Sequence, residues 1–354
     1  MEIGFFTMPL HPPGSDITKT FDDDLDQIVS LDKWGYKEAW IGEHFTSEWE
    51  NIPNPDLFIA NLIARTNNIM LGTGVNCLPN HEPFMLAHRI AQLDHMAHGR
   101  FLWGIGAGAY VGDCEVFGYD PSTEENRKMF RDTIDVILKI WQDPDPGVYE
   151  KWNWSFKVPE PLESAGLRLH LKPYQKPHPP IAVGGVSPYS STLALAGERG
   201  WIPMSINVVP TRVLKTHWEA VERGASTTGL TPNRAEWRIC RDVYVAETTE
   251  QAREEALEGV LTRDFQRYFL PLFADRNLTS LAKENPDMPD SDLTAEYLMD
   301  NIWVVGSPDD VADKLRNLHH DVGGFGTLLA MGHEWEPKEK WTNSMIMLVN
   351  EVMP

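Results

Sequence analysis

Short apolar runs alternate along the chain with longer segments whose apolar residues recur at helical spacing. The runs at residues 3–8 and 38–42 have the length of buried strands, and turn-forming residues follow the first of them. Between these runs, Phe21, Leu25 and Ile28 are spaced to lie on one face of a helix. A strand that is followed each time by a helix predicts a parallel sheet with helices outside it.

Eight strands are predicted, at residues 3–8, 38–42, 69–74, 101–105, 180–184, 201–205, 237–246 and 325–331. Helical patterns separate them, and the pattern at residues 338–352 predicts a closing helix. This number of alternations in 354 residues predicts an α/β fold, a (β/α)8 TIM barrel. A doubly wound sheet is the alternative, but it would need a chain reversal that we do not find.

Two segments interrupt the alternation. Residues 143–179, after the fourth strand, are rich in Pro and Trp and predict an irregular insertion. Residues 262–301, after the seventh strand, predict a second insertion, irregular or helical, with an acidic patch at 285–292. No shift in composition divides the chain, so residues 1–354 are expected to form a single barrel domain.

The composition restricts partners and compartment. The formal net charge of −21 argues against nucleic acid and anionic membranes, because both require a basic surface. No apolar run approaches the ~20 residues of a membrane-spanning helix. Three widely spaced cysteines form no disulfide framework or metal pattern, and the first residues lack the basic region of a signal peptide. A cytoplasmic location is therefore expected.

The clearest candidate chemistry is Glu43-His44, directly after the second strand. Barrels present their chemistry at the carboxyl ends of strands, and a neutral imidazole can exchange a proton near neutral pH. The pair could equally be a hydrogen-bonded strand end that only orders the following loop. His81 follows the third strand and could face the same mouth.

Two glycine-containing turns are weaker candidates. Residues 104–108 read GIGAG, which would let a ring or phosphate approach the backbone, or could simply be a tight turn. The strand end at residues 184–185 leads into hydroxyl residues at a helix start, which suits an anion or plain N-capping. No HExxH or GxSxG motif is present, so no metal site is expected; glycosidase-type carboxylate pairs stay open.

Taken together, these segments resemble the bacterial luciferase-like flavin monooxygenases. The matching stretches are WIGEHFT (40–46), LGTGV (71–75), LPNH (78–81), LDHMAHGRF (93–101), ERG (198–200) and VGSP (305–308). Their order and spacing cover nearly the whole chain. Residues 42–44 and 49–53 are most similar to the diketocamphane and limonene monooxygenase-like group.

The resemblance implies an oxygenase that receives reduced FMN from a separate flavin reductase. Reduced FMN and O2 would form a C4a-(hydro)peroxyflavin that oxygenates a small apolar substrate, such as a cyclic ketone or terpenoid. Baeyer–Villiger insertion and epoxidation or hydroxylation both stay open. So do F420-dependent hydride transfer and non-catalytic flavin binding. A homodimer through the helices at 55–64 and 83–96 is also implied.

The resemblance also assigns roles to residues. His44 matches the proposed catalytic base, and Gly74-Val75 matches an unusual cis peptide beside the flavin. Gly106 and Ala107 replace luciferase's reactive cysteine and its phosphate-binding arginine, so light emission is not expected. Two residues, His81 and Trp201, are assigned to the substrate side of the pocket. The implied cofactor contacts are Phe6, Gly74, Val75, Gly106, Tyr189, Ser190, Ser191 and Thr192.

Overall fold

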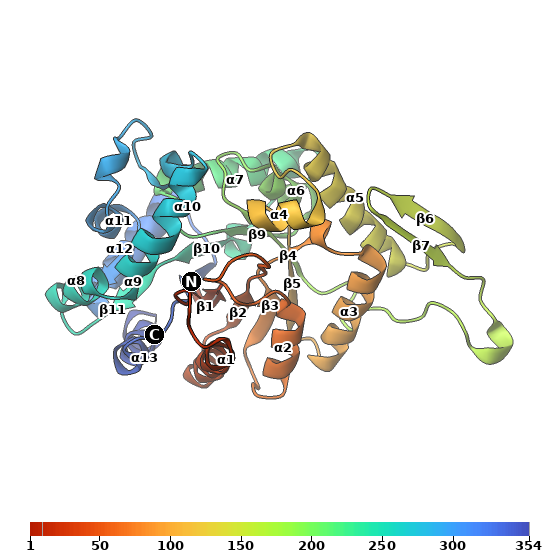
Figure 1. The fold of residues 1–354 in the computed structure, drawn as a ribbon, viewed down its shortest axis with the longest axis horizontal. Coiled ribbons are helices and arrows are strands. Elements are labelled where there is room, and N and C mark those ends of the chain that lie inside the picture. Colours follow the sequence, from red (N-terminus) through yellow and green to blue (C-terminus); the bar gives the residue numbers. More distant parts are fainter. Residues whose placement is uncertain (9, 354) are drawn as a thin grey trace.

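Eight parallel strands close into a barrel in the computed structural model, which describes residues 1–8 and 10–353 (Figure 1). In chain order they are β1 (Glu2–Thr7), β2 (Glu38–Ile41), β3 (Met70–Thr73), β5 (Phe101–Gly106), β8 (Ile181–Gly185), β9 (Ile202–Ser205), β10 (Arg238–Arg241) and β13 (Thr327–Met331). β1 pairs with both β2 and β13, and the pairing of β3 with β5 completes the ring. The predicted (β/α)8 fold is confirmed.

Helices surround the barrel. They include α1 (Ile17–Trp34), α2 (Pro55–Ile63), α3 (Pro83–Met96), α5 (Glu124–Ile140), α6 (Ser191–Arg199), α7 (Thr211–Ser226), α8 (Thr249–Glu258), α12 (Pro308–Val322) and α13 (Lys338–Met347). Local sequence sets their ends: Asp16 caps α1, and Gly35 ends it in the left-handed conformation. No helix within residues 1–8 and 10–353 is long and apolar enough to cross a membrane.

The predicted seventh strand is broken in two at Asp242. β10 stays in the barrel, whereas β11 (Val243–Val245) leaves it and pairs with β12 (Val304–Gly306), a strand the apolar pattern did not predict. Short β4 (Asn76–Cys77) continues from β3 and also pairs with β5. A continuous apolar run therefore marked the strand correctly but could not reveal where it changes partners.

The segment at 143–179 is more regular than predicted. It contains an antiparallel hairpin of β6 (Gly147–Lys151) and β7 (Trp154–Val158), which projects from the barrel (Figure 1). Tyr149 and Phe156 stack across the two strands with ring centroids 5.3 Å apart. Cross-strand aromatic pairs of this kind stabilise a hairpin despite the many prolines around it.

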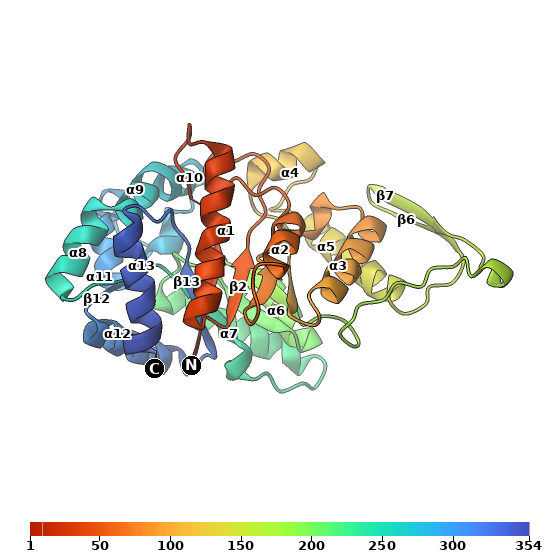
Figure 2. The same cartoon turned by 90° about the horizontal axis from the view of Figure 1, so that it is seen from below.

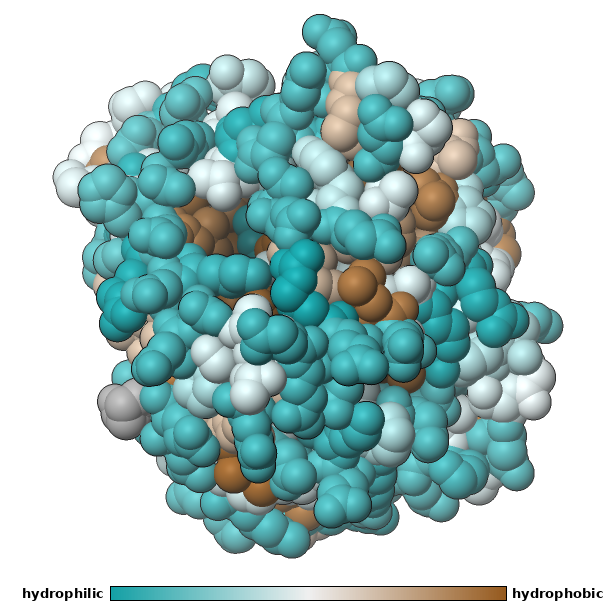
Figure 3. All heavy atoms as spheres, turned by 90° about the vertical axis from the view of Figure 1, so that its left-hand side faces the viewer, coloured by the Kyte–Doolittle hydropathy of each residue, from teal (hydrophilic) through white to brown (hydrophobic). Residues whose placement is uncertain are grey.

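The segment at 262–301 is largely helical. Its elements are α9 (Val260–Asp264), a π-helical turn (Phe265–Phe269), α10 (Leu270–Asp275) and α11 (Ala295–Asn301). Figure 2 shows α9, α10 and α4 (Val111–Phe117), which was not predicted, at one end of the molecule and both termini at the other. The surface around α8 and α12 is mostly hydrophilic, as the acidic composition requires (Figure 3).

The barrel interior is filled by one ion pair and large side chains. Arg238 on β10 reaches Glu38 on β2 with two hydrogen bonds of 3.1 and 3.2 Å. Trp40 donates its indole N–H to the same carboxylate at 2.9 Å. Space for this Trp comes from glycine: a Cβ at Gly72 would lie 2.5 Å from the Trp40 ring, and one at Gly104 would lie 3.3 Å from it. The side of the barrel around Trp40 therefore depends on glycines opposite it.

Replacing Arg238 with Met should lower the free energy of unfolding by about 3 kcal/mol, because Glu38 would remain buried without its countercharge. Urea denaturation followed by tryptophan fluorescence measures this. Lys128→Met is the matched control, since it removes an exposed pair with Glu124 and should cost less than about 1 kcal/mol. Equal, small effects of the two substitutions would contradict an ion pair that stabilises the barrel.

Candidate active site

His44 lies just beyond the carboxyl end of β2, in a loop tied down on both sides. Its amide N–H donates to the Ile52 carbonyl at 3.1 Å, and Leu10 forms an isolated antiparallel bridge with Glu50. The His44 side chain is 16% exposed, so the ring is shielded but still reachable. Strand ends of parallel barrels are where catalytic groups gather, and the loop holds His44 there.

The side chains of Glu43 and His44, which the sequence suggested as a pair, have different partners in the structure. The buried Glu43 carboxylate accepts hydrogen bonds from His81 Nε2 at 2.8 Å and from Asn76 Nδ2 at 3.0 Å. Arg89 approaches the other His81 nitrogen, Nδ1, at 3.3 Å. Both ring nitrogens of His81 are thus held by protein groups, and its place on the substrate side of the pocket stays a prediction. Consecutive residues at a strand end point in different directions.

His44 instead lies between two carboxylates, one in its own loop and one on a helix after β5. Asp113, on α4, places Oδ2 3.0 Å from His44 Nδ1. Its other oxygen accepts from the amides of Phe45 and Thr46 at 3.0 and 2.9 Å. Glu50 places Oε2 3.4 Å from His44 Nε2. Neither Asp113 nor Glu50 was predicted, because no local pattern links residues that meet only when the loops close over the barrel.

The surroundings of His44 set its protonation state, which the sequence left open. Burial by itself lowers its pKa, but the charges of Glu50 and Asp113 and the Asp113 hydrogen bond outweigh burial and raise the pKa above its usual value. Burial raises the pKa of Glu50. Burial also opposes ionisation of Asp113, yet hydrogen bonds from His44 and Thr46 lower its pKa. The site therefore favours an imidazolium at His44, a group that holds a proton.

The residues expected around the flavin ring partly come together. The Gly74–Val75 peptide bond is cis. A Cβ at Gly74 would lie 2.9 Å from the buried Phe6 ring, and a Cβ at Gly106 would lie 2.5 Å from Val75 Cγ2. Gly184, at the end of β8, lies on the other side of Val75, where a Cβ would be 3.5 Å from Cγ1. Strands β3, β5 and β8 thus end in an arc without bulky side chains, apart from Val75.

The predicted anion site at α6 uses its hydroxyls differently from what was expected. Ser190 caps the helix by accepting from Leu193 N, and Thr192 Oγ1 donates to the Gly184 carbonyl at 2.7 Å. With the Leu193 amide taken by this cap, the amides of Ser191 and Thr192 have no acceptor within the helix and are the donors open to an anion. Tyr189 has a positive φ of 53°, and its ring is 55% exposed.

A basic side chain also lies at this helix start. Arg223 on α7 donates to the Tyr189 carbonyl at 3.2 Å. The sequence could not assign a cation here, because Arg223 comes close to Tyr189 only through the packing of α6 against α7.

Trp201 was assigned to the wrong end of the barrel. It precedes β9, so it lies at the amino end of that strand, opposite the mouth. There its ring meets His178 edge-on at 6.5 Å and lies under the Arg199 guanidinium at 5.7 Å. Chain order already places a residue that precedes a strand at the amino end of a parallel barrel. Trp201 is not part of the candidate site.

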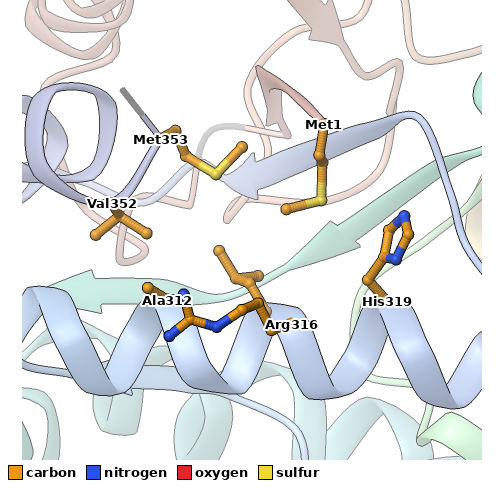
Figure 4. A pocket seen from close by; sticks show the side chains of 7 residues that line it. Met1, Ala312, Arg316, His319, Val352 and Met353 are labelled. Atoms are coloured by element: carbon orange, nitrogen blue, oxygen red, sulfur yellow. The ribbon is translucent and has the colours of Figure 1, made fainter.

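A cavity of about 230 Å³ lies at this same amino end (Figure 4). Its lining is Met1, Ala312, Leu315, Arg316, His319, Val352 and Met353. Met1 directly precedes β1, and no predicted site residue contributes to the lining. The cavity is therefore separate from the candidate active site.

A second buried histidine joins the 262–301 segment to the barrel mouth. His333 follows β13, and its ring nitrogens lie 3.0 Å from Asp242 Oδ1 and 2.8 Å from Asp264 Oδ2. Burial alone lowers the pKa of His333, but its hydrogen bonds to these carboxylates raise it to about 9. Arg263 bridges Asp264 to Glu334. This charge cluster anchors α9 to the ends of β10 and β13.

Fold and site together define a TIM-barrel enzyme whose ionisable groups gather at the carboxyl ends of the strands. The chain belongs to the luciferase-like monooxygenase family, whose family model matches residues 1–324. The family expected from the sequence is confirmed.

Relatives match over the full length of the chain. It is 33% identical to 4-hydroxyprotoasukamycin monooxygenase of Streptomyces nodosus subsp. asukaensis, covering 100% of this chain and 92% of that protein. It is 32% identical to 3,6-diketocamphane 1,6-monooxygenase of Pseudomonas putida, with coverages of 100% and 98%. Limonene 1,2-monooxygenase of Rhodococcus erythropolis is 30% identical, with coverages of 100% and 86%.

Solved structures agree with these matches. The oxygenating constituent of 3,6-diketocamphane monooxygenase from Pseudomonas putida, in complex with FMN, has a TM-score of 0.92 at 33% identity, covering 100% of this chain and 98% of that chain. An F420-dependent secondary alcohol dehydrogenase has a TM-score of 0.69 at 18% identity, covering 97% of each chain. The second likeness shows a shared fold alone.

The His333 cluster should make stability depend on alkaline pH. Because folding raises the pKa of His333, the stabilisation that protonated His333 gives the folded chain is complete below about pH 6.5. This stabilisation is lost as the pH rises through about 9. His333→Gln should lower the free energy of unfolding by about 3 kcal/mol at pH 6.5 and flatten this decline. Urea denaturation between pH 6 and 10 tests both effects. His320→Gln, at a 90% exposed side chain, is the control; identical behaviour of the two variants would contradict the assignment.

Proposed function

We propose that this chain is the oxygenase component of a two-component flavin-dependent monooxygenase. It receives reduced FMN from a separate reductase and uses O2, through a C4a-(hydro)peroxyflavin, to oxygenate a small apolar cyclic ketone or terpenoid. The observation that carries the proposal is the partly buried His44, held between Asp113 and Glu50 at the strand-end rim that also carries the Gly74–Gly106 arc. Full-length similarity to an FMN-containing oxygenase supports it.

The residues at the mouth fit the two parts of FMN. A flat ring suits the arc formed by Gly74, Gly106 and Gly184, which is bordered by side chains that include Val75 and Phe6. A phosphate suits the first-turn amides of α6, with Arg223 as the nearby cation. Arg223 would then supply the positive charge for the phosphate that the resemblance to luciferase places at position 107, where this chain has Ala107. When bound and reduced, FMN supplies the activation of O2.

His44 would control a proton at the reacting centre. Its imidazolium, flanked by two carboxylates, donates a proton or a charged hydrogen bond more readily than it removes a proton. Asp113 orients the ring through Nδ1, and the Phe45 and Thr46 amides orient Asp113 in turn. The remaining accessible part of the ring would face the substrate. Baeyer–Villiger insertion and epoxidation or hydroxylation are both compatible with this arrangement.

The substrate class is proposed from the relatives together with the site. Among the relatives, the diketocamphane enzymes carry the names of cyclic ketones and the limonene enzyme that of a cyclic terpene. The insertion at 262–301 reaches the mouth through its π-helical turn, so this segment is placed to shape the substrate space. We also propose that the chain and its reductase partner are located in the cytoplasm.

Rapid mixing of the chain and reduced FMN with O2 should give a transient absorbance distinct from that of oxidised FMN. His44→Gln should bind FMN with similar affinity but lower turnover of a cyclic ketone or monoterpene by about 10²-fold or more, since a proton-transfer group contributes about 10²–10⁴. Lack of any transient would contradict the oxygenase function. Tighter binding of F420 than of FMN, with hydride transfer to substrate, would favour the deazaflavin alternative. FMN binding without turnover in the wild-type chain would favour mere flavin binding, and unchanged turnover in His44→Gln would refute the role of His44.

We also propose a homodimer formed through α2, α3 and α4. Leu57, Met85 and Val116 on these helices are 72%, 57% and 63% exposed, more than large apolar side chains usually are. Leu57→Glu combined with Met85→Glu should convert a dimer to a monomer, because two charges per chain would have to be desolvated at the interface. Light scattering measures the mass. Leu230→Glu, at a 46% exposed residue after α7, is the control; a wild-type monomer would refute the dimer.

A further inference from the structure

Tyr268, on the π-helical turn of the 262–301 segment, lies directly against the candidate site. Its hydroxyl donates to Glu50 Oε2 at 2.6 Å. Both residues are buried, with Tyr268 7% and Glu50 3% exposed, so water competes little for this hydrogen bond. A residue 218 positions away in the chain thus supplies a hydrogen-bond donor for a carboxylate in the loop after β2.

The oxygen that accepts from Tyr268 is also the one that faces the catalytic histidine. Glu50 Oε2 lies 3.4 Å from His44 Nε2, while Asp113 Oδ2 lies 3.0 Å from His44 Nδ1. Carboxylates on both sides of the ring match an imidazolium, whose two nitrogens are both donors. Glu43 adds a third negative charge nearby, and the uncharged Tyr110 ring meets His44 at 4.8 Å.

The Tyr268 ring is held in place by its neighbours. Trp49 stacks on it with centroids 5.6 Å apart, and Phe269 contacts it at 5.1 Å. The Arg267 guanidinium lies 5.9 Å from the Trp49 ring. Trp49 itself is anchored, because its carbonyl accepts from the His11 amide at 2.9 Å. Packing therefore presents the hydroxyl to Glu50 in a defined direction.

We infer that Glu50 and Tyr268 are positioning residues, through which the 262–301 segment keeps the proton on His44. The effect of this arrangement on turnover rests on the proposed function. The effect of Tyr268 and Glu50 on the protonation of His44, here called the proton linkage, does not, because it is a property of the chain without cofactor or substrate. The insertion placed to shape the substrate space would then also set the protonation state of the residue that acts on the substrate.

The direction of the linkage follows from the chemistry of the hydrogen bond. Tyr268 donates to Glu50 and so stabilises the ionised carboxylate. Without that donor, a buried Glu50 takes up the proton that His44 otherwise carries, and the pair changes from imidazolium–carboxylate to imidazole–carboxylic acid. No proton is gained or lost in this exchange; it moves from His44 to Glu50.

NMR of the full-length chain, with its 12 histidines labelled in the imidazole ring, measures the pKa of His44 without cofactor. His44→Gln identifies the resonance by its disappearance. Wild-type His44 should titrate above the usual value of about 6.5. Tyr268→Phe keeps the ring stacked on Trp49 and should lower the pKa by about one unit. Glu50→Gln removes the charge and should lower it by about one unit or more.

Tyr244→Phe is the matched control. Tyr244 donates to Glu255 Oε2 at 2.8 Å, a similar tyrosine–glutamate bond on β11 and α8. It should leave the His44 titration unchanged. If Tyr268→Phe and Glu50→Gln also leave it unchanged, the inference is overturned. Should Tyr268→Phe fail to fold, as judged by circular dichroism, Glu50→Gln alone decides the outcome.

Turnover separates this inference from the proposed function. In an active oxygenase, Tyr268→Phe should shift the part of the turnover–pH profile that His44 governs. The shift should equal the change in the His44 pKa measured by NMR. Tyr244→Phe should leave the turnover–pH profile unchanged. A chain that oxygenates nothing but shows the NMR shifts would refute the proposed function and keep the linkage. An active oxygenase with an unshifted His44 would refute the linkage alone.

Discussion

Closure of eight parallel strands into one ring places all their carboxyl ends on a single rim, and the remaining features of the site depend on this. Residues as distant in sequence as His44 and Asp113 meet because the loops after β2 and β5 both rise from that rim. Inside the ring, the Glu38–Arg238 pair and Trp40 fill the space that closure creates. The barrel can therefore present a charged site at its mouth because its interior is packed and paired.

The rim could be predicted from the sequence because a buried parallel strand is a continuous apolar run, and each run is bounded by turn residues. Direction along the barrel follows from chain order, which is why His44 was placed correctly at a strand end. The same rule should have excluded Trp201, which begins a strand rather than ends it. That error came from choosing a residue by its aromatic character instead of its position in the strand.

Other features of the site were not predictable in this way, for a physical reason. Asp113, Glu50 and Tyr268 lie in three different segments, and their meeting is a result of tertiary packing rather than of any periodicity. The protonation state of His44 could not be predicted either, because it depends on the two carboxylates that raise the pKa of the ring. Electrostatic character is thus a property of the assembled loops.

Gly106 illustrates how one residue can constrain another across strands. A Cβ there would lie 2.5 Å from Val75 Cγ2, a distance that no side chain tolerates without displacement of Val75. Gly74 is restricted in the same way by Phe6 and Trp40, each 2.9 Å from the position of its Cβ. A side chain at position 106 would therefore have to displace the β-branched Val75. Ionisable groups reach this part of the rim from the loops instead, as His44 does, held by carboxylates from two of them.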